Sequence, residues 1–382
     1  MSGPISAYVL HVGPVGRFAG FVAVLSLAAC AADVGDEATD GNEDAVIVDT
    51  STPAARAQYD ANVAFLRSYV PHCKPSGSKR PRVIVTGFGR FLSTNDNATG
   101  HIVNTLVPAA RYPSTTAPAP GKVDLPGPQT SVAVSTIHLP SAGDVDVCAM
   151  IVPVYWDLAA ILVAKEVDAF RPNLVLMNGV ADQEQDLWLE LGAVNRAMTE
   201  VDGSDMLTPV APLGQTSAKI VSSATKQDDR RGLLLSWNTV EDAARAAIAS
   251  RAGHLDEDGR RFGDVLTGAS LAGFPRSGNT YLCNNITYAV DYLMAYPGKT
   301  ITLLKASKPV AGRTNQVSVS IHADVRAVPR IFMHWPSTLA GSHLGDAAQV
   351  LAAVIDAQLT AKDPATRGSN GLAEIVSTGD TF

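Results

Sequence analysis

The segment from Ala149 to Met177 places one helical pattern between two apolar runs typical of strands. Residues 149–155 and 173–177 are short and mainly aliphatic, whereas residues 158–170 carry apolar side chains at helical spacing. Because the links between them are short, the order strand, helix, strand predicts a crossover between parallel neighbours. The pattern therefore predicts an α/β fold, in which a sheet is covered by helices on both faces.

Further patterns fit this architecture. Residues 82–86 and 130–139 are rich in β-branched side chains, as strands are, and residues 59–70 repeat apolar side chains at helical spacing. Residues 316–323 alternate apolar and polar side chains, which predicts an added, half-exposed strand. Residues 56–382 are enough to bury one large core, so we expect a single domain there.

The first thirty residues resemble an export signal. An apolar run from Phe18 to Ala29 follows Arg17 and is too short to span a membrane, as in a secretory signal peptide. It ends in Leu-Ala-Ala-Cys at residues 27–30, which resembles the bacterial lipobox, whose cysteine is acylated. We therefore expect residues 1–30 to be a lipoprotein signal peptide and Cys30 to carry a lipid anchor. This predicts an exported protein, anchored in a membrane and facing the periplasm or the cell surface.

Residues 31–55 contain seven acidic residues and no lysine or arginine. A segment of low hydrophobicity and one sign of charge does not bury enough apolar surface to fold, so we expect an acidic, disordered tether. Removing these acids and Arg17 from the net charge of −7 leaves −1 for residues 56–382. A nearly neutral domain has no basic stripe for a nucleic acid, so we expect no nucleic-acid partner.

Three residues supply the chemistry of a thiol hydrolase. Cys283 precedes a run with helical periodicity, so we expect it at a helix N-terminus, where the helix dipole favours the thiolate. His334 would take the thiol proton and later return one to the leaving amine. Glu190 would orient the imidazole and stabilise its charged form. We expect these residues to form a catalytic triad.

The segments around these residues resemble pyroglutamyl peptidase I, a cysteine peptidase that is also called pyrrolidone-carboxylate peptidase. The resemblance rests on VIVTGFGRF at residues 83–91, on Glu190 five residues before Asn195, on TYLCNN at residues 280–285 and on His-Trp-Pro at residues 334–336. It implies a three-layer α/β/α sandwich of the phosphorylase/hydrolase type, with a mixed, mostly parallel central sheet. It also implies removal of N-terminal pyroglutamate from peptides.

The resemblance further implies substrate-binding roles for Phe88 and Phe91, which would line an apolar pocket for the lactam ring, and for Asn97. The chain departs from the family pattern in that Arg90 replaces a proline and Leu191 replaces an arginine. These departures preserve the thiol chemistry better than the substrate specificity.

Two regions are longer than the family pattern requires, and we expect insertions around residues 200–270 and 298–328. The four cysteines fit an exported protein. With Cys30 acylated and Cys283 catalytic, Cys73 and Cys148 remain, and either a disulfide or two thiols would accommodate them.

The sequence contains neither His-Glu-x-x-His nor Cys-x-x-Cys, and we expect no metal and no cofactor. The expected partner is a peptide or small amide substrate, and the sequence leaves the oligomeric state open. Two alternatives stay open. One is a surface lipoprotein that retains the fold but binds without catalysis, and the other is an amidase that acts on another lactam or on an amide of the cell envelope.

Overall fold

The computed structural model describes residues 46–92, 94–181, 185–211, 215–339, 341–369 and 372. Cys30 and the predicted signal peptide lie outside the described residues. The helices are α1 (Pro53–Ser68), α2 (Ala98–Leu106), α3 (Leu158–Phe170), α4 (Trp237–Ala249), α5 (Phe262–Val265), α6 (Leu282–Ala295) and α7 (Leu344–Thr360). Short 3₁₀ helices span Gly127–Gln129, Lys226–Asp228, Ser277–Asn279 and Ser337–Leu339.

A nine-stranded mixed sheet forms the centre of the fold. Its main path runs in the order β13 (Gly268–Ala272), β6 (Asp186–Glu190), β17 (Arg330–Pro336), β5 (Leu174–Ala181), β2 (Arg82–Phe88), β4 (Gly143–Val152) and β3 (Ser131–Leu139). Neighbours are parallel except for β6 with β17 and β3 with β4. Strand β12 (Leu234–Leu235) pairs with β17 and with β18 (Thr366–Arg367).

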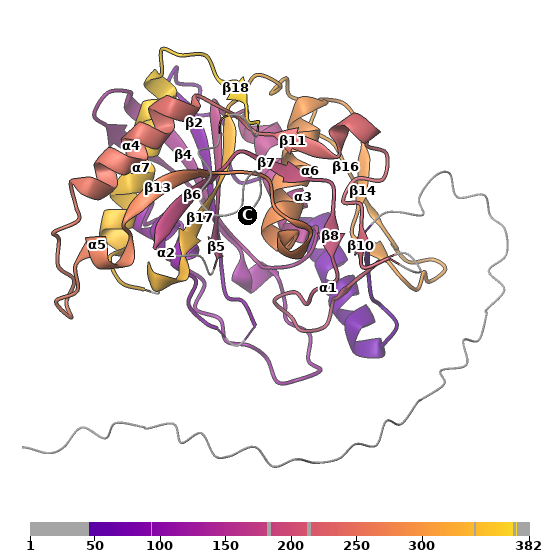
Figure 1. The fold of residues 1–382 in the computed structure, drawn as a ribbon. Helices are drawn as coiled ribbons and strands as arrows, with labels where there is room; N and C mark the ends of the chain where they lie inside the picture. The colour runs from indigo at the N-terminus through magenta and orange to yellow at the C-terminus, as the bar shows by residue number, and fades with distance from the viewer. Residues whose placement is uncertain are drawn as a thin grey trace, which may run out of the picture. The chain divides into compact units, whose positions relative to one another are not determined.

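Helices cover both faces of this sheet (Figure 1). Helices α2, α4 and α7 pack together on one face, and α3 and α6 pack on the other, with α1 against α3. The inner strands β2, β5 and β17 are buried on both faces, which explains why they are continuous apolar runs. The structure thus confirms the predicted α/β/α fold with a mixed, mostly parallel sheet.

Shorter strands form small sheets outside the central one. They are β1 (Ile47–Val48), β7 (Gly192–Val194), β8 (Ala197–Met198), β9 (Pro209–Val210), β10 (Ser217–Ala218), β11 (Arg230–Gly232), β14 (Ile301–Leu303), β15 (Lys305–Ala306) and β16 (Val317–Val319). The added strand predicted at residues 316–323 is present as β16, which pairs with β14. Among the described residues, no helix is both long and apolar enough to cross a bilayer.

The predicted acidic tether is wrong for residues 46–55. Val46 and Val48 are buried, and β1 pairs with β15 and β9. Thr52 then caps α1, with its side chain accepting a hydrogen bond from the Ala55 backbone N–H at 3.1 Å. The acidic composition of the surrounding segment concealed a three-residue apolar run that is long enough to pair with two other strands.

Two strand and helix boundaries also differ from the prediction. Strand β4 begins at Gly143 rather than at residue 149. The polar Asp146 fits inside this buried strand because Thr136 and Arg80 are its partners. The strand ends before Pro153, which has no N–H to donate. Val70, expected in the first helix, lies beyond α1 and is exposed.

Candidate active site

Cys283 is the second residue of α6 and is half buried. Tyr281, at the N-cap position, provides no side-chain cap, so the positive end of the helix dipole is not compensated from that residue. The sulfur therefore lies beside the free backbone N–H groups of the first helical turn. The placement at a helix N-terminus agrees with the prediction from sequence.

His334 and Glu190 come from two adjacent strands of the central sheet. The imidazole Nδ1 of His334, on β17, forms an ion pair with Oε1 of Glu190, on β6. Both residues are buried, with 7% and 1% of their surfaces exposed. This contact leaves Nε2 as the nitrogen available to the thiol.

The environment of His334 favours its charged form. Burial by itself lowers the pKa of this imidazole, but the charges of Glu190 and Cys283, and hydrogen bonds to both side chains, raise the pKa to about 10. The structure therefore brings the three predicted triad residues together, with His334 between the carboxylate and the thiol.

Gly179 makes the close approach of these elements possible. It lies on β5 opposite His334 in the register of β5 and β17. A Cβ atom at this position would lie 2.8 Å from the sulfur of Cys283 and 2.7 Å from the ring of Phe332. Any larger side chain would displace the thiol, which gives this glycine a specific role at the site.

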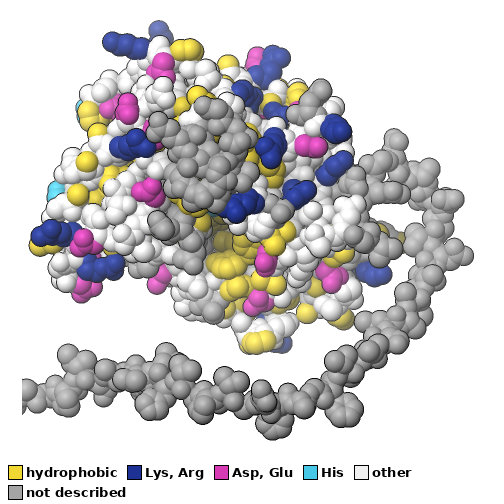
Figure 2. Space-filling view, in the orientation of Figure 1, with side chains coloured by type: hydrophobic (Ala, Val, Ile, Leu, Met, Phe, Trp, Pro, Cys, Tyr) yellow, Lys and Arg dark blue, Asp and Glu magenta, His cyan; other side chains and the backbone are white. Residues whose placement is uncertain are grey.

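Two cavities meet at Cys283. The first has a volume of about 310 Å³, and its wall includes Phe88, Phe91, Asn97 and Tyr281. All three predicted substrate-binding residues thus line one cavity together with the thiol. Figure 2 shows hydrophobic side chains gathered in a hollow on the face that it presents.

Two of the residues in the first cavity have further contacts that fix their positions. Phe91 and Tyr281 are packed edge to face, with ring centroids 6.2 Å apart. The side-chain oxygen of Asn97 caps α2 by accepting a hydrogen bond from the Thr99 backbone N–H at 3.1 Å. Asn97 therefore has a structural function at the helix start in addition to its place in the cavity wall.

The second cavity, of about 570 Å³, contains His334 in its wall. Met198, Gly278 and Asn279 form part of its other side. A group that receives a proton from His334 would therefore lie in this second cavity, because the wall of the first cavity includes the thiol but not His334.

Arg90, which departs from the family pattern, does not line either cavity. Its guanidinium is buried in an ion pair with Asp124 and donates a hydrogen bond to the Leu92 carbonyl at 3.0 Å. The Gln58 side chain in turn holds the Asp124 backbone: it accepts a hydrogen bond from the N–H at 2.7 Å and donates one to the carbonyl at 2.8 Å. Arg90 thus fixes the loop that carries Phe91, a function that a proline would serve by rigidity.

Sequence reasoning missed the asparagines that follow the thiol. The Asn284 side chain bonds the backbone of Val194 and Arg196, and the Asn285 side chain bonds Asp157. These contacts fix the start of α6 against the end of β7 and the N-cap residue of α3. The signal available in the sequence was a pair of asparagines inside a helix, where their propensity is poor.

A further residue pair supports the strand that carries His334. The Trp335 indole N–H donates to the Asn178 side chain at 2.9 Å, and Asn178 donates to the Thr86 carbonyl at 2.8 Å. Strands β17, β5 and β2 are therefore bonded to one another directly below the site, which restricts movement of the imidazole.

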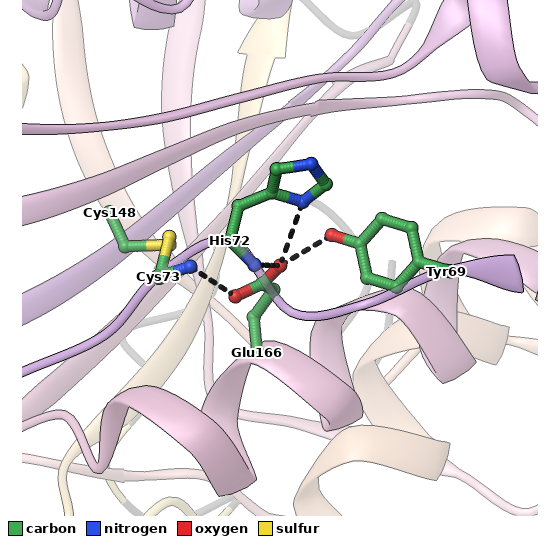
Figure 3. Close-up of a disulfide and its surroundings, with 5 residues drawn as sticks. All are labelled: Tyr69, His72, Cys73, Cys148 and Glu166. Carbon is green, nitrogen blue, oxygen red and sulfur yellow. Dashed lines mark hydrogen bonds and ion pairs between the residues drawn. A yellow bond between two sulfur atoms is a disulfide. The ribbon is translucent and has the colours of Figure 1, made fainter.

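The remaining predicted pair does not line either cavity, and Figure 3 shows its surroundings. Cys73 and Cys148 form a disulfide, and the Glu166 carboxylate accepts hydrogen bonds from the backbone N–H groups of His72 and Cys73 at 2.8 and 2.9 Å. Tyr69 donates a third. Although Cys73, Cys148 and Glu166 lie close enough to surround a metal ion, the two sulfurs are bonded to each other.

No family model matches this chain, and no curated protein matches it. Among solved structures, it is similar to pyroglutamyl peptidase I of Bacillus amyloliquefaciens, with a TM-score of 0.46, 12% identity, and coverage of 75% of this chain and 100% of the other. It is also similar to the pyrrolidone carboxyl peptidase of Thermococcus litoralis, with a TM-score of 0.44, 14% identity, and coverage of 73% and 93%.

Proposed function

We propose that this chain is a cysteine hydrolase that removes an N-terminal pyroglutamyl residue from peptides. One observation carries the proposal: the Cys283 thiol lies in the wall of an apolar cavity and contacts the His334 imidazole, which is paired in turn with the Glu190 carboxylate. A thiol at a helix start beside a buried imidazolium is the arrangement that makes cysteine a nucleophile.

The reaction would begin with attack of the Cys283 thiolate on the carbonyl carbon of the scissile amide. The first-turn backbone N–H groups of α6 would donate to the oxygen that becomes negative. As the C–N bond breaks, His334 gives its proton to the leaving amine, and a thioester remains on Cys283. Water then attacks the thioester carbonyl carbon while His334 accepts its proton. The C–S bond breaks, the acid is released, and the Cys283 thiolate is restored beside protonated His334.

The first cavity supports the pyroglutamyl specificity. A flat, mostly apolar lactam fits between aromatic side chains, and Phe88, Phe91 and Tyr281 supply three such rings. A cavity of about 310 Å³ beside the thiol has room for one such residue before the scissile bond, as an exopeptidase requires.

Incubation of the protein with pyroglutamyl p-nitroanilide under mild reducing conditions tests the proposal. The matched substrate is prolyl p-nitroanilide, which has the same ring without the lactam carbonyl. We expect turnover of the pyroglutamyl amide alone, and none by Cys283→Ala. Turnover of a different lactam amide would favour the amidase alternative, and no turnover of any amide would favour a binding protein.

We also propose that the protein is exported and held to a membrane by a lipid on Cys30. The lipobox-like Leu-Ala-Ala-Cys supports the anchor. The Cys73–Cys148 disulfide supports an oxidising compartment, because such bonds are rare where thiols are kept reduced.

A further inference from the structure

A third cavity, of about 450 Å³, lies beside the proposed active site and is basic. Arg196, Arg230, Arg276 and Lys219 contribute to its wall, and Asp229 is the acidic residue among them. The three arginines are exposed. Within the described part of the chain, none of the three forms an ion pair with a carboxylate.

This basic cavity shares two chain segments with the second cavity. In the first segment, residues 194–196 line the basic cavity and Met198 lines the second cavity. In the other segment, Pro275 and Arg276 line the basic cavity, and Gly278 and Asn279 line the second cavity. Asn284, next to the thiol, donates to the backbone carbonyl of Arg196 at 2.7 Å. The two cavities are therefore neighbours along the same wall, and Figure 2 shows Lys and Arg side chains gathered along one side of the hollow.

The side on which the basic cavity lies determines which part of a substrate reaches it. His334, which protonates the leaving amine, lines the second cavity but not the apolar one. In the proposed reaction, residues that follow the scissile bond would therefore extend from Cys283 through the second cavity toward the arginines. Guanidinium groups pair with carboxylates through two parallel hydrogen bonds, so this position favours acidic side chains.

From this geometry we infer that the enzyme selects peptides with acidic residues shortly after the scissile bond, and that Arg196, Arg230 and Arg276 bind those carboxylates. The inference rests on the proposed function for the direction of the substrate. It assigns to the basic cavity a role in specificity that the triad does not supply.

Binding to the Cys283→Ala variant tests this inference without requiring turnover. Two peptides are compared by calorimetry, pyroglutamyl-Ala-Glu-Glu-Ala amide and its neutral counterpart with Gln-Gln. We expect the acidic peptide to bind at least about tenfold more tightly in low salt, and the difference to shrink at 0.5 M salt, because the Debye length falls to a few ångströms. Equal affinities for the two peptides would overturn the inference.

Variants locate the effect. Adding Arg196→Gln, Arg230→Gln or Arg276→Gln should reduce the preference for the acidic peptide, and the triple change should abolish it while leaving the affinity for the neutral peptide unaltered. Arg326→Gln removes one exposed arginine, which is paired with Asp324 away from the cavity. It is the control for each single change, because it alters the net charge by the same amount. A preference that survives the triple change, or falls equally with Arg326→Gln, contradicts a role for this cavity. Hydrolysis of pyroglutamyl p-nitroanilide by the wild type reports separately on the proposed function.

Discussion

Glu190 lies diagonally across from His334 on the adjacent antiparallel strand. In the register of β6 and β17, Glu190 pairs with Phe332, two residues before His334, so the carboxylate and the imidazole project from the same face of the sheet. Because both partners are on buried strands and not on loops, the contact is fixed by the backbone. The orientation of the imidazole toward Cys283 is thus built into the central sheet.

Replacement of the triad residues should separate proton transfer from orientation. His334→Ala should lower kcat by at least about a hundredfold, since it removes the acid and base, and Glu190→Gln should lower it less. Iodoacetamide should alkylate Cys283 in the wild type faster than in Glu190→Gln, because loss of the carboxylate lowers the pKa of His334 and weakens the ion pair with the thiolate. Equal alkylation rates in the two proteins would contradict a linked triad.

Protein stability should fall as the pH rises from 4 to 7 because of Asp202. Burial raises the pKa of this carboxyl to about 7, although hydrogen bonds from Ser204 oppose the effect. The folded protein thus binds a proton that the unfolded chain loses near pH 4, and the stabilisation is lost as the pH passes 7. Asp202→Asn should raise the free energy of unfolding at pH 8 by up to about 4 kcal/mol.

Urea denaturation at pH 4 and pH 8 measures this effect. Asp242→Asn, at an exposed position on α4, should change stability little at either pH and is the matched control. If Asp202→Asn destabilises the protein at pH 8, the fold favours the ionised carboxylate, its pKa is not raised, and the prediction is wrong.

Loss of the Asp291 carboxylate should destabilise the fold strongly. This buried group forms ion pairs with Arg330 and Arg231, each at 2.6 Å, and with Arg367 at 3.0 Å. Burial opposes its ionisation, but the three arginines hold its pKa at about 2. Asp291→Asn should therefore cost about 3–5 kcal/mol at pH 7, because buried guanidinium groups lose their counter-charge.

The half-buried Asp60, which pairs with Arg56 and Arg313, provides the control for this change. Asp60→Asn should cost about 1 kcal/mol or less. Since the pKa of Asp291 is lowered, its contribution is present above pH 4 and is lost as the pH falls toward 2. Chemical denaturation of the two variants at pH 7 decides the comparison, and similar losses for both would refute the prediction.

Removal of the disulfide should lower stability without removing the nucleophile. The bond closes a loop with a sequence separation of 75 residues, and its loss should cost about 2–4 kcal/mol by releasing the unfolded chain. Cys73→Ser with Cys148→Ser tests this by denaturation, with pyroglutamyl amide hydrolysis as the second readout. Non-reducing peptide mapping of exported wild-type protein should recover the linked peptides, and two free thiols there would exclude the bond.

Cys30→Ala should move the protein from the membrane fraction to the soluble fraction. Each buried CH₂ of an acyl chain contributes about 0.8 kcal/mol, and more than one chain is needed for stable anchoring. Cys283→Ala is the matched cysteine control and should remain with the membrane. Partitioning that is unchanged by Cys30→Ala would rule out this residue as the anchor.

The sequence by itself determined the elements and the chemistry. Helix α3 and strands β5 and β2 follow from local periodicity, because each buries a face whose spacing is set by its own backbone geometry. Cys283, His334 and Glu190 were predicted from the order and spacing of the motifs around them, which resemble those of pyroglutamyl peptidase I. A helix start after Tyr281 was predictable from the apolar repeat that follows the cysteine.

Only the tertiary structure decided how these parts meet. Nothing in residues 186–190 indicates that β6 runs antiparallel to β17, yet that direction places Glu190 beside His334. The short strand β1, the charge cluster around Asp291 and the basic cavity likewise join residues far apart in the chain. Such features leave no periodic pattern in the sequence, because the groups that surround a charge are brought together only by folding.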